Sequence, residues 1–201
     1  MVTAPLSRAD AQRRRVLDAS VEIFSRRGFR ATSMNEIAAG VGLSKPTLYH
    51  YFRNKEELLV RIYSEVLDES LRMGRATIEA APTAFDAVRD LLVSRVVYTC
   101  ENRQLLKICF EEEDELRPDL AEELLRRRRA FDALFTSALT RHLSEHSGVE
   151  LGMTPTVYAN MCLGAVNWTY KWYSPEGPRT PAELGRELAD ALLCALRPGP
   201  G

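Results

Sequence analysis

The sequence predicts an all-α protein, in which a three-helix N-terminal head is joined by a long helix to a larger helical body. Apolar residues recur at intervals of three and four along most of the chain, as they do on the buried face of a helix. Alternating patterns typical of strands are nearly absent, and serine, glycine and proline stand where helix ends belong. With 201 residues, of which 45% are hydrophobic, the chain is long enough to bury packed cores.

The head is predicted to begin with a helix from about Arg8 to Arg27. Ser7 and Asp10 are placed as its N-terminal cap pair, and Gly28 stands where a C-terminal stop belongs. The apolar residues of this helix, Phe24 among them, lie on one face that the head can bury.

Two short helices follow, separated by a turn that contains glycine. The first begins after Ser33, which is placed to form a capping box with Glu36. The second begins at Ser44, tolerates Pro46 in its first turn and ends near Phe52. Such a pair, between longer helices, is typical of a helix-turn-helix, whose second helix enters the major groove of DNA.

The body is reached through a fourth helix that opens with Asn54 and runs past Leu71, so no flexible linker separates the two parts. One long helical stretch is expected from Pro82 to about Arg117, and a further helix from about Pro118 to His146. Because the fourth helix belongs to both parts, movement of the body could reach the head.

The last two helices are predicted over Pro155–Tyr173 and Pro181–Leu196. Small residues in the first of them, such as Ala159 and Gly164, permit close approach of another helix. The last helix has an apolar face that we expect a partner chain to cover. We therefore expect a homodimer through these helices, with two recognition helices about 34 Å apart on one side of palindromic DNA.

The charge is unevenly distributed although the net charge is only −1. Residues 1–60 carry ten Lys and Arg against six Asp and Glu, which leaves seventeen against twenty-two for the rest. The basic end is where a polyanion would dock. No apolar stretch approaches the roughly 20 residues of a membrane span, and the N-terminus lacks the apolar core of a signal peptide, so we expect a cytoplasmic protein without membrane contact.

The cysteines are far apart in the sequence, lack C-x-x-C spacing and stand in apolar helical surroundings. They are Cys100, Cys109, Cys162 and Cys194. This pattern predicts reduced thiols in the core.

The run from Gly28 to Leu59 carries a continuous pattern of residue types through both short helices. Its segments are Thr32-Ser33-Met34, Ile37-Ala38, Gly42-Leu43-Ser44-Lys45, Thr47-Leu48-Tyr49-His50-Tyr51-Phe52 and Asn54-Lys55-Glu56. In spacing and residue type this run resembles the signature of the TetR family of transcriptional regulators. The resemblance implies that DNA is contacted at nine positions: Thr32, Ser33, Lys45, Pro46, Thr47, Tyr49, His50, Tyr51 and Lys55.

The same resemblance implies a repressor that binds a palindromic operator in double-stranded DNA and is released by a small-molecule effector. It implies a DNA-binding domain over residues 1–53 and a ligand-binding and dimerisation domain over residues 54–201. A transcriptional activator with the same head is the alternative. A helical acyl-thioester enzyme is disfavoured, because the sequence shows no nucleophile elbow and no phosphate-cradling glycine loop, so we expect no catalytic residue and no cofactor.

The segment Gly164–Gly177 resembles a pattern in the TetR subset that controls fatty-acid and sterol breakdown. Because several members of that subset respond to acyl-coenzyme A thioesters, the resemblance implies an acyl-CoA or another hydrophobic effector. The same aromatic residues could instead build the dimer core. Candidate pocket residues are apolar, apart from one arginine that could receive a phosphate or carboxylate or simply be solvated: Phe85, Val96, Arg103, Phe131, Phe135, Tyr158, Met161 and Trp168.

Neither of two further clusters is expected to bind a metal ion. His142 and His146 lie four residues apart on a predicted helix, but no third ligand accompanies them, so we expect no metal site. The acidic run Glu111–Glu115 could bind a hard cation or pair with Arg126–Arg129, but a solvated helix end is the favoured interpretation.

Overall fold

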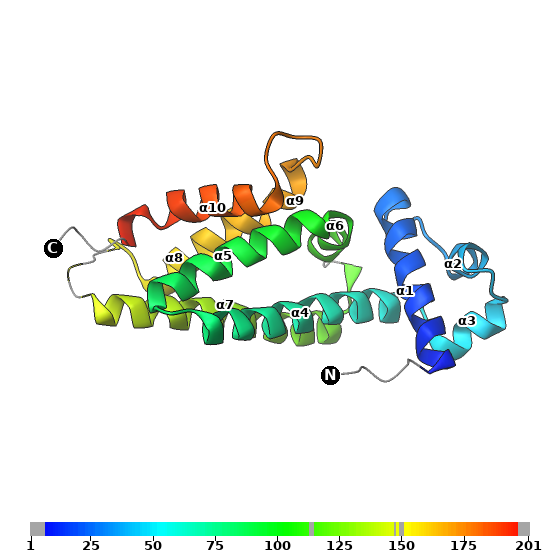
Figure 1. The fold of residues 1–201 in the computed structure, drawn as a ribbon. Helices are drawn as coiled ribbons and strands as arrows, with labels where there is room; N and C mark the ends of the chain where they lie inside the picture. The colour runs from blue at the N-terminus through cyan, green and yellow to red at the C-terminus, as the bar shows by residue number, and fades with distance from the viewer. Residues whose placement is uncertain (1–6, 113–114, 147, 149–150, 197–201) are drawn as a thin grey trace. The chain divides into compact units, whose positions relative to one another are not determined.

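The computed structural model describes residues 7–112, 115–146, 148 and 151–196 (Figure 1). Every regular element among these residues is a helix, so the predicted all-α class is confirmed. None of the described helices is long and apolar enough to cross a membrane. Residues 1–6, Glu113 and Asp114 lie outside the described residues, and so do the expectations that concern them.

The chain forms two compact units. The first contains residues Met1–Glu65 and Gln104–Leu124, and the second contains Val66–Arg103 and Leu125–Gly201. Two helices continue from one unit into the other, α4 (Lys55–Ala80) and α7 (Pro118–Glu145).

The first unit holds the helix-turn-helix. Besides the shared helices α4 and α7, this unit contains α1 (Arg8–Arg27), α2 (Met34–Gly40), α3 (Lys45–Tyr51) and α6 (Arg103–Glu111). The helix-turn-helix is formed by α2 and α3. The predicted bounds of α1 are confirmed, because Ser7 Oγ accepts a hydrogen bond from the Asp10 amide at 3.1 Å and Gly28 ends the helix with φ +80°.

The caps predicted for the two short helices are present as well. Ser33 and Glu36 form a reciprocal capping box at the start of α2, and Ser44 Oγ accepts from the Thr47 amide at the start of α3. These caps satisfy amides that would otherwise lack a partner, which allows helices of only seven residues to begin where they do.

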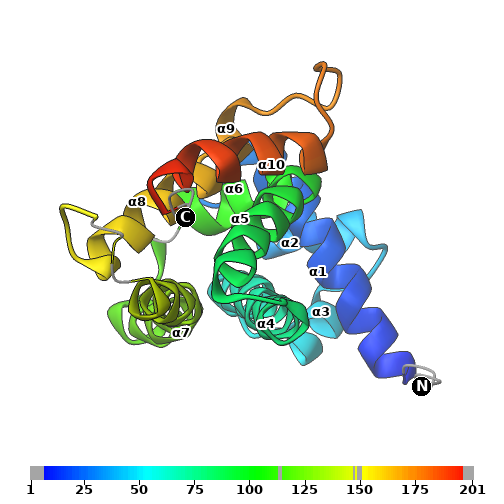
Figure 2. The same cartoon turned by 60° about the vertical axis from the view of Figure 1, so that its left-hand side comes forward.

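The second unit is built around α5 (Ala84–Glu101). Its other helices are α8 (Pro155–Asn167), α9 (Thr169–Trp172), α10 (Pro181–Leu192) and the short 3₁₀ helix η2 (Cys194–Leu196). Figures 1 and 2 both show α10 running along α5, and α8 and α9 also contact α5. Gly185 permits the close approach of α10, since a Cβ there would lie 3.1 Å from the Val93 carbonyl oxygen of α5.

Two expected helices are divided in the structure. The stretch from Pro82 to Arg117 breaks at Asn102, whose side-chain amide donates to the Tyr98 carbonyl and ends α5, so α6 is a separate helix. The segment Pro155–Tyr173 likewise divides at Trp168 into α8 and α9.

The apolar face of the last helix is partly packed within the chain, and its coverage by a partner chain stays a prediction. Leu184 on this face is buried, and Leu188 and Leu192 pack against the core of the same chain, which includes α5. The apolar face of α10 therefore already has an intramolecular partner.

Candidate nucleic-acid interface and ligand cavity

Helix α3 presents polar and aromatic side chains to solvent over two buried anchors. Leu48 and Phe52 point into the core of the head, as predicted, and are 0% and 5% exposed. The exposed side chains are Lys45, Pro46, Thr47, Tyr49 and His50, and that of Tyr51 is half-buried. Such a helix can offer ammonium, hydroxyl and imidazole groups to phosphates and base edges.

The N-terminal half of α1 extends this surface with positive charge. The guanidinium of Arg13 lies 5.9 Å from the centroid of the Tyr51 ring, so α1 and α3 contribute to the same face of the head. Arg13 was not among the predicted DNA contacts, although the basic run Arg13–Arg15 is a visible signal in the sequence.

Thr32 and Ser33 differ in solvent exposure. Thr32 is buried, and its hydroxyl donates to the Gly28 carbonyl at 2.8 Å. Ser33 is exposed, and its hydroxyl is engaged with Glu36 in the capping box. Contact of either residue with DNA stays a prediction.

Lys55 has its ammonium group on the turn between α1 and α2. It donates to the carbonyl oxygens of Phe29, Arg30 and Thr32 at 2.8, 3.0 and 3.2 Å, and its Nζ lies 4.6 Å from the Phe29 ring centroid. An ammonium group has three N–H donors, so these bonds match its full donor capacity. The structure thus gives Lys55 a role inside the head, and its contact with DNA stays a prediction.

Two members of the acidic run also reach this turn. Glu112 accepts from the Phe29 amide at 3.1 Å, and Glu115 forms an ion pair with Arg30 at 2.6 Å. The interpretation of the run as a solvated helix end is therefore wrong for these two carboxylates.

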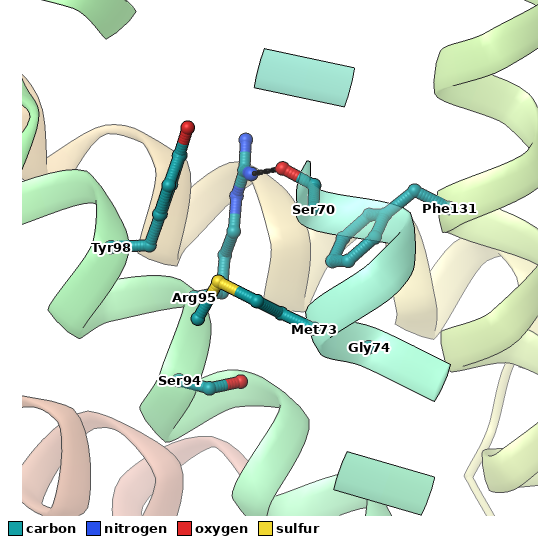
Figure 3. Close-up of a pocket in the computed structure, with 7 residues that line it drawn as sticks. All are labelled: Ser70, Met73, Gly74, Ser94, Arg95, Tyr98 and Phe131. Carbon is teal, nitrogen blue, oxygen red and sulfur yellow. Dashed lines mark hydrogen bonds between the residues drawn. The ribbon is translucent and has the colours of Figure 1, made fainter. Parts of the chain in front are cut away.

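A small cavity of about 10 Å³ lies within the second unit (Figure 3). Its lining residues come from α4, α5 and α7: Ser70, Met73, Gly74, Ser94, Arg95, Tyr98 and Phe131. Six of these seven were not predicted, and Phe131 was.

Arg95 is the charged residue of the cavity lining and is only 8% exposed. Its Nε donates to Asn167 Oδ1 at 2.6 Å and its Nη1 to Ser70 Oγ at 2.8 Å, which joins α5 to α8 and to α4. Figure 3 shows the guanidinium between Ser70 and the ring of Tyr98. Buried N–H donors beside apolar walls suit a ligand that carries an oxygen acceptor on an apolar body.

One signal for Arg95 was present in the sequence. Val88, Leu92, Arg95 and Thr99 follow helical spacing, so the arginine stands on the buried stripe of α5. A charged residue at such a position is rarely buried without a specific partner.

The remaining candidate pocket residues lie apart from this cavity. Val96, Phe135 and Tyr158 are buried in the core of the second unit, and Phe85 packs with a centroid distance of 5.4 Å on the His142 ring. Arg103 is half-buried, with its Nε 3.5 Å from the Tyr170 carbonyl oxygen. Met161 and Trp168 are exposed.

Exposed apolar side chains form a stripe along α8, which we call the α8 stripe. It consists of Val157, Met161, Gly164 and Trp168, whose spacing of four, three and four places them on one helical face. The three large members are 54%, 46% and 57% exposed. A Cβ added at Gly164 would have no heavy atom within 4 Å, so this face can be approached closely.

Burial raises the pKa of a cysteine thiol and of a tyrosine hydroxyl in the second unit. Desolvation raises the pKa of Cys162 to about 11 and that of Tyr158 to about 12, so both are neutral at physiological pH. Three cysteines are buried thiols as predicted, whereas Cys194 is exposed and the core interpretation is wrong for it.

One histidine of the pair, His142, hydrogen-bonds to the backbone of the same chain. His142 is buried, with its Nε2 2.8 Å from the Leu196 carbonyl oxygen. Within the part of the chain that the structure describes, no three His, Cys, Asp or Glu side chains are grouped to hold a metal ion.

Comparison with known families matches both parts of the chain. Residues 16–62 match the family described as bacterial regulatory proteins, tetR family, and residues 81–196 match the tetracyclin repressor-like C-terminal domain.

Two similar proteins come from mycobacteria. The HTH-type transcriptional activator FasR of Mycolicibacterium smegmatis is 25% identical over 169 residues, 84% of this chain and 75% of FasR. The HTH-type transcriptional repressor KstR2 of Mycobacterium tuberculosis is 22% identical over 197 residues, 92% of each chain.

Solved structures that share the fold include those of PfmR and AibR. PfmR from Thermus thermophilus superimposes with a TM-score of 0.81 at 25% identity, covering 90% of this chain and 98% of that one. AibR in complex with isovaleryl coenzyme A and operator DNA gives a TM-score of 0.79 at 24% identity, covering 90% and 97%.

Proposed function

The chain belongs to the TetR family of bacterial regulatory proteins, and we propose that it is a repressor that binds a palindromic operator as a homodimer and is released by a hydrophobic effector. Members of this family are transcriptional regulators and not enzymes. The observation that carries the DNA-binding part of the proposal is α3, with five exposed side chains over buried Leu48 and Phe52.

DNA contact is assigned to the exposed face of the head. Ser33 and the α3 residues Lys45 to Tyr51, with Leu48 directed inward, meet the phosphates and the major groove. Contact of Thr32 and Lys55 with DNA remains part of the proposal, and their polar groups, bonded inside the head, also stabilise the turn before α2. The DNA-binding domain in this proposal is residues 1–53, and residues 54–201 bind the effector and dimerise.

The α8 stripe supports the dimer. Exposed apolar patches of this kind mark interaction surfaces, and a homodimer buries the same patch from both chains. A second copy of α8 placed against Gly164 would cover Met161 and Trp168.

The effector site is assigned to the cavity at Arg95. Ligand pockets usually span about 300–1,000 Å³, so a cavity of about 10 Å³ must enlarge greatly before a thioester can enter. Enlargement would displace α4, because Ser70, Met73 and Gly74 all lie on it, and α4 begins at Lys55 in the head. An acyl-CoA is the proposed class, supported by the structural similarity to AibR, which was solved with isovaleryl coenzyme A.

The test is DNA binding by the full chain, followed by titration with isovaleryl coenzyme A and with free coenzyme A. The DNA is a duplex that wild-type protein enriches from a random-sequence pool. We expect the thioester to release wild-type protein, and Arg95→Met to bind DNA but to respond at least about tenfold more weakly, as expected when a charged hydrogen bond is lost.

Each part of the proposal has its own contradicting outcome. Binding that is indifferent to the thioester, or release by coenzyme A alone, contradicts the acyl effector and leaves the DNA-binding regulator standing. Failure to enrich any duplex contradicts DNA binding itself. Because one relative is a named activator and another a named repressor, a reporter placed behind the enriched sequence decides the direction: repression predicts lower expression when the protein is present.

A further inference from the structure

The turn from Gly28 to Ser33 connects α1 to α2, and charged side chains from two distant segments hold it. Lys55, at the start of α4, donates to three of its carbonyl oxygens. Two carboxylates from the segment that follows α6 accept from the N–H donors of the turn, namely the Phe29 amide and the Arg30 guanidinium. Glu112 lies 83 residues and Lys55 lies 26 residues from Phe29 in sequence, yet all three belong to the first unit.

Glu112 binds the backbone of the turn. Its Oε1 accepts from the Phe29 amide at 3.1 Å, next to the end of α1, where amides and carbonyls leave the helical pattern. Gly28 adopts φ +80°, and a Cβ there would lie 3.8 Å from the same carboxylate oxygen. Phe29 is buried and packs edge-on against Phe24 at 5.2 Å, so the bonded amide has a fixed position.

Glu115 binds the side chain of the turn. Its Oε1 lies 2.6 Å from both Nε and Nη2 of Arg30. The hydrogen bond from Arg30, aided by the charges of Arg30 and Lys55, lowers the pKa of Glu115, so this carboxylate is ionised at neutral pH. A second ion pair, Arg117 with Glu56 at 3.3 Å, joins the start of α7 to the start of α4 beside it.

The turn leads directly into the DNA-contacting part of the head. Ser33 caps α2, and α2 packs on α3, so displacement of the turn displaces both helices. The carboxylates stand between α6 and α7, and the chain on either side of them continues into the second unit.

We propose that Glu112 and Glu115 are positioning residues for DNA recognition, which hold the turn from Gly28 to Ser33 so that α2 and α3 keep the geometry that the DNA groove requires. This inference rests on the proposed DNA binding. It gives the acidic run a role that its composition alone does not indicate.

The experiment compares full-length variants on the enriched duplex and on a scrambled duplex of the same composition. Glu112→Ala removes the acceptor of the Phe29 amide, Glu112→Gln retains an acceptor carbonyl, and Glu115→Gln breaks the ion pair. Glu122→Ala, an exposed glutamate in the first turns of α7, is the matched control. Titration at DNA concentrations above the dissociation constant gives the active fraction, which separates loss of folding from loss of affinity.

We expect Glu112→Ala to raise the dissociation constant for the enriched duplex about tenfold at unchanged active fraction, in line with the loss of a charge-assisted hydrogen bond. Glu112→Gln should restore most of this affinity, and Glu115→Gln should weaken binding by a smaller factor. If Glu112→Ala folds poorly, Glu115→Gln carries the test alone.

Three results would overturn the inference: affinity of the folded Glu112→Ala equal to that of Glu122→Ala, a Glu112→Gln variant as weak as Glu112→Ala, or, where Glu112→Ala loses only active fraction, a Glu115→Gln affinity equal to that of Glu122→Ala. Wild-type binding is measured first, so failure of DNA binding itself is recognised before any variant is compared.

Discussion

Two lysines of the head illustrate how position decides the role of one residue type. Lys45 is exposed on α3, where its ammonium group lies 5.8 Å from the Tyr49 ring centroid and can reach a phosphate. Lys55 is half-buried and donates to three carbonyl oxygens. Its removal would leave these carbonyls without a charged donor, which costs stability before it affects DNA.

We therefore expect Lys55→Ala to lower the free energy of unfolding by about 1–3 kcal/mol, since three carbonyl groups lose their donor. Lys45→Ala should change it by less than about 0.5 kcal/mol, as is usual for an exposed residue. Urea unfolding at one fixed protein concentration measures both. Equal stability of the two variants would show that the bonds of Lys55 contribute little to the fold.

Some placements of individual residues could be predicted from the sequence, and others could not. The exposed face of α3 was predictable, because the helix is short, capped at Ser44 and anchored by Leu48 and Phe52. The bond from the Phe29 amide to Glu112 was not, since no local pattern links residues 83 positions apart. Arg95 could have been found as a charge on a buried stripe.

At the scale of the element, α8 and α10 differ in how much of their apolar faces the chain itself covers. The pronounced apolar face of α10 is covered by α5 of the same chain, whereas α8 leaves Met161 and Trp168 exposed. Periodicity shows which face of a helix is apolar but not which neighbour covers it.

A charged residue in the α8 stripe should therefore prevent dimerisation. We expect Met161→Glu to be folded and monomeric, because two buried carboxylates would face each other across the symmetric interface. Thr156→Glu, exposed in the first turn of the same helix, should remain dimeric. Light scattering coupled to gel filtration gives the molar mass, and a dimeric Met161→Glu would place the interface elsewhere.

Helix ends were predictable where a capping side chain or a glycine marks them. Ser7, Ser33 and Ser44 begin helices where expected, and Gly28 ends α1. The break at Asn102 carries neither proline nor glycine, so the helical pattern continues across it in sequence. Only the structure divides α5 from α6.

At the scale of the whole molecule, the chain passes between the two units three times, after Glu65, after Arg103 and after Leu124. An effector bound in the second unit can influence the head through these covalent passages. Two of them lie within α4 and α7, and the third joins α5 to α6. Whatever the route, the effector shifts the equilibrium only by its difference in affinity for the two conformations.

DNA recognition by α3 is tested by the affinity of the full chain for the enriched duplex over a range of salt concentrations. We expect specific binding over the scrambled duplex, and an affinity that falls linearly on logarithmic axes as salt rises. Lys45→Ala should reduce that slope by about one, as expected for one lost phosphate contact. Equal affinity for the enriched and scrambled duplexes, or a slope that Lys45→Ala leaves unchanged, would contradict the assignment of α3 as the DNA-reading helix.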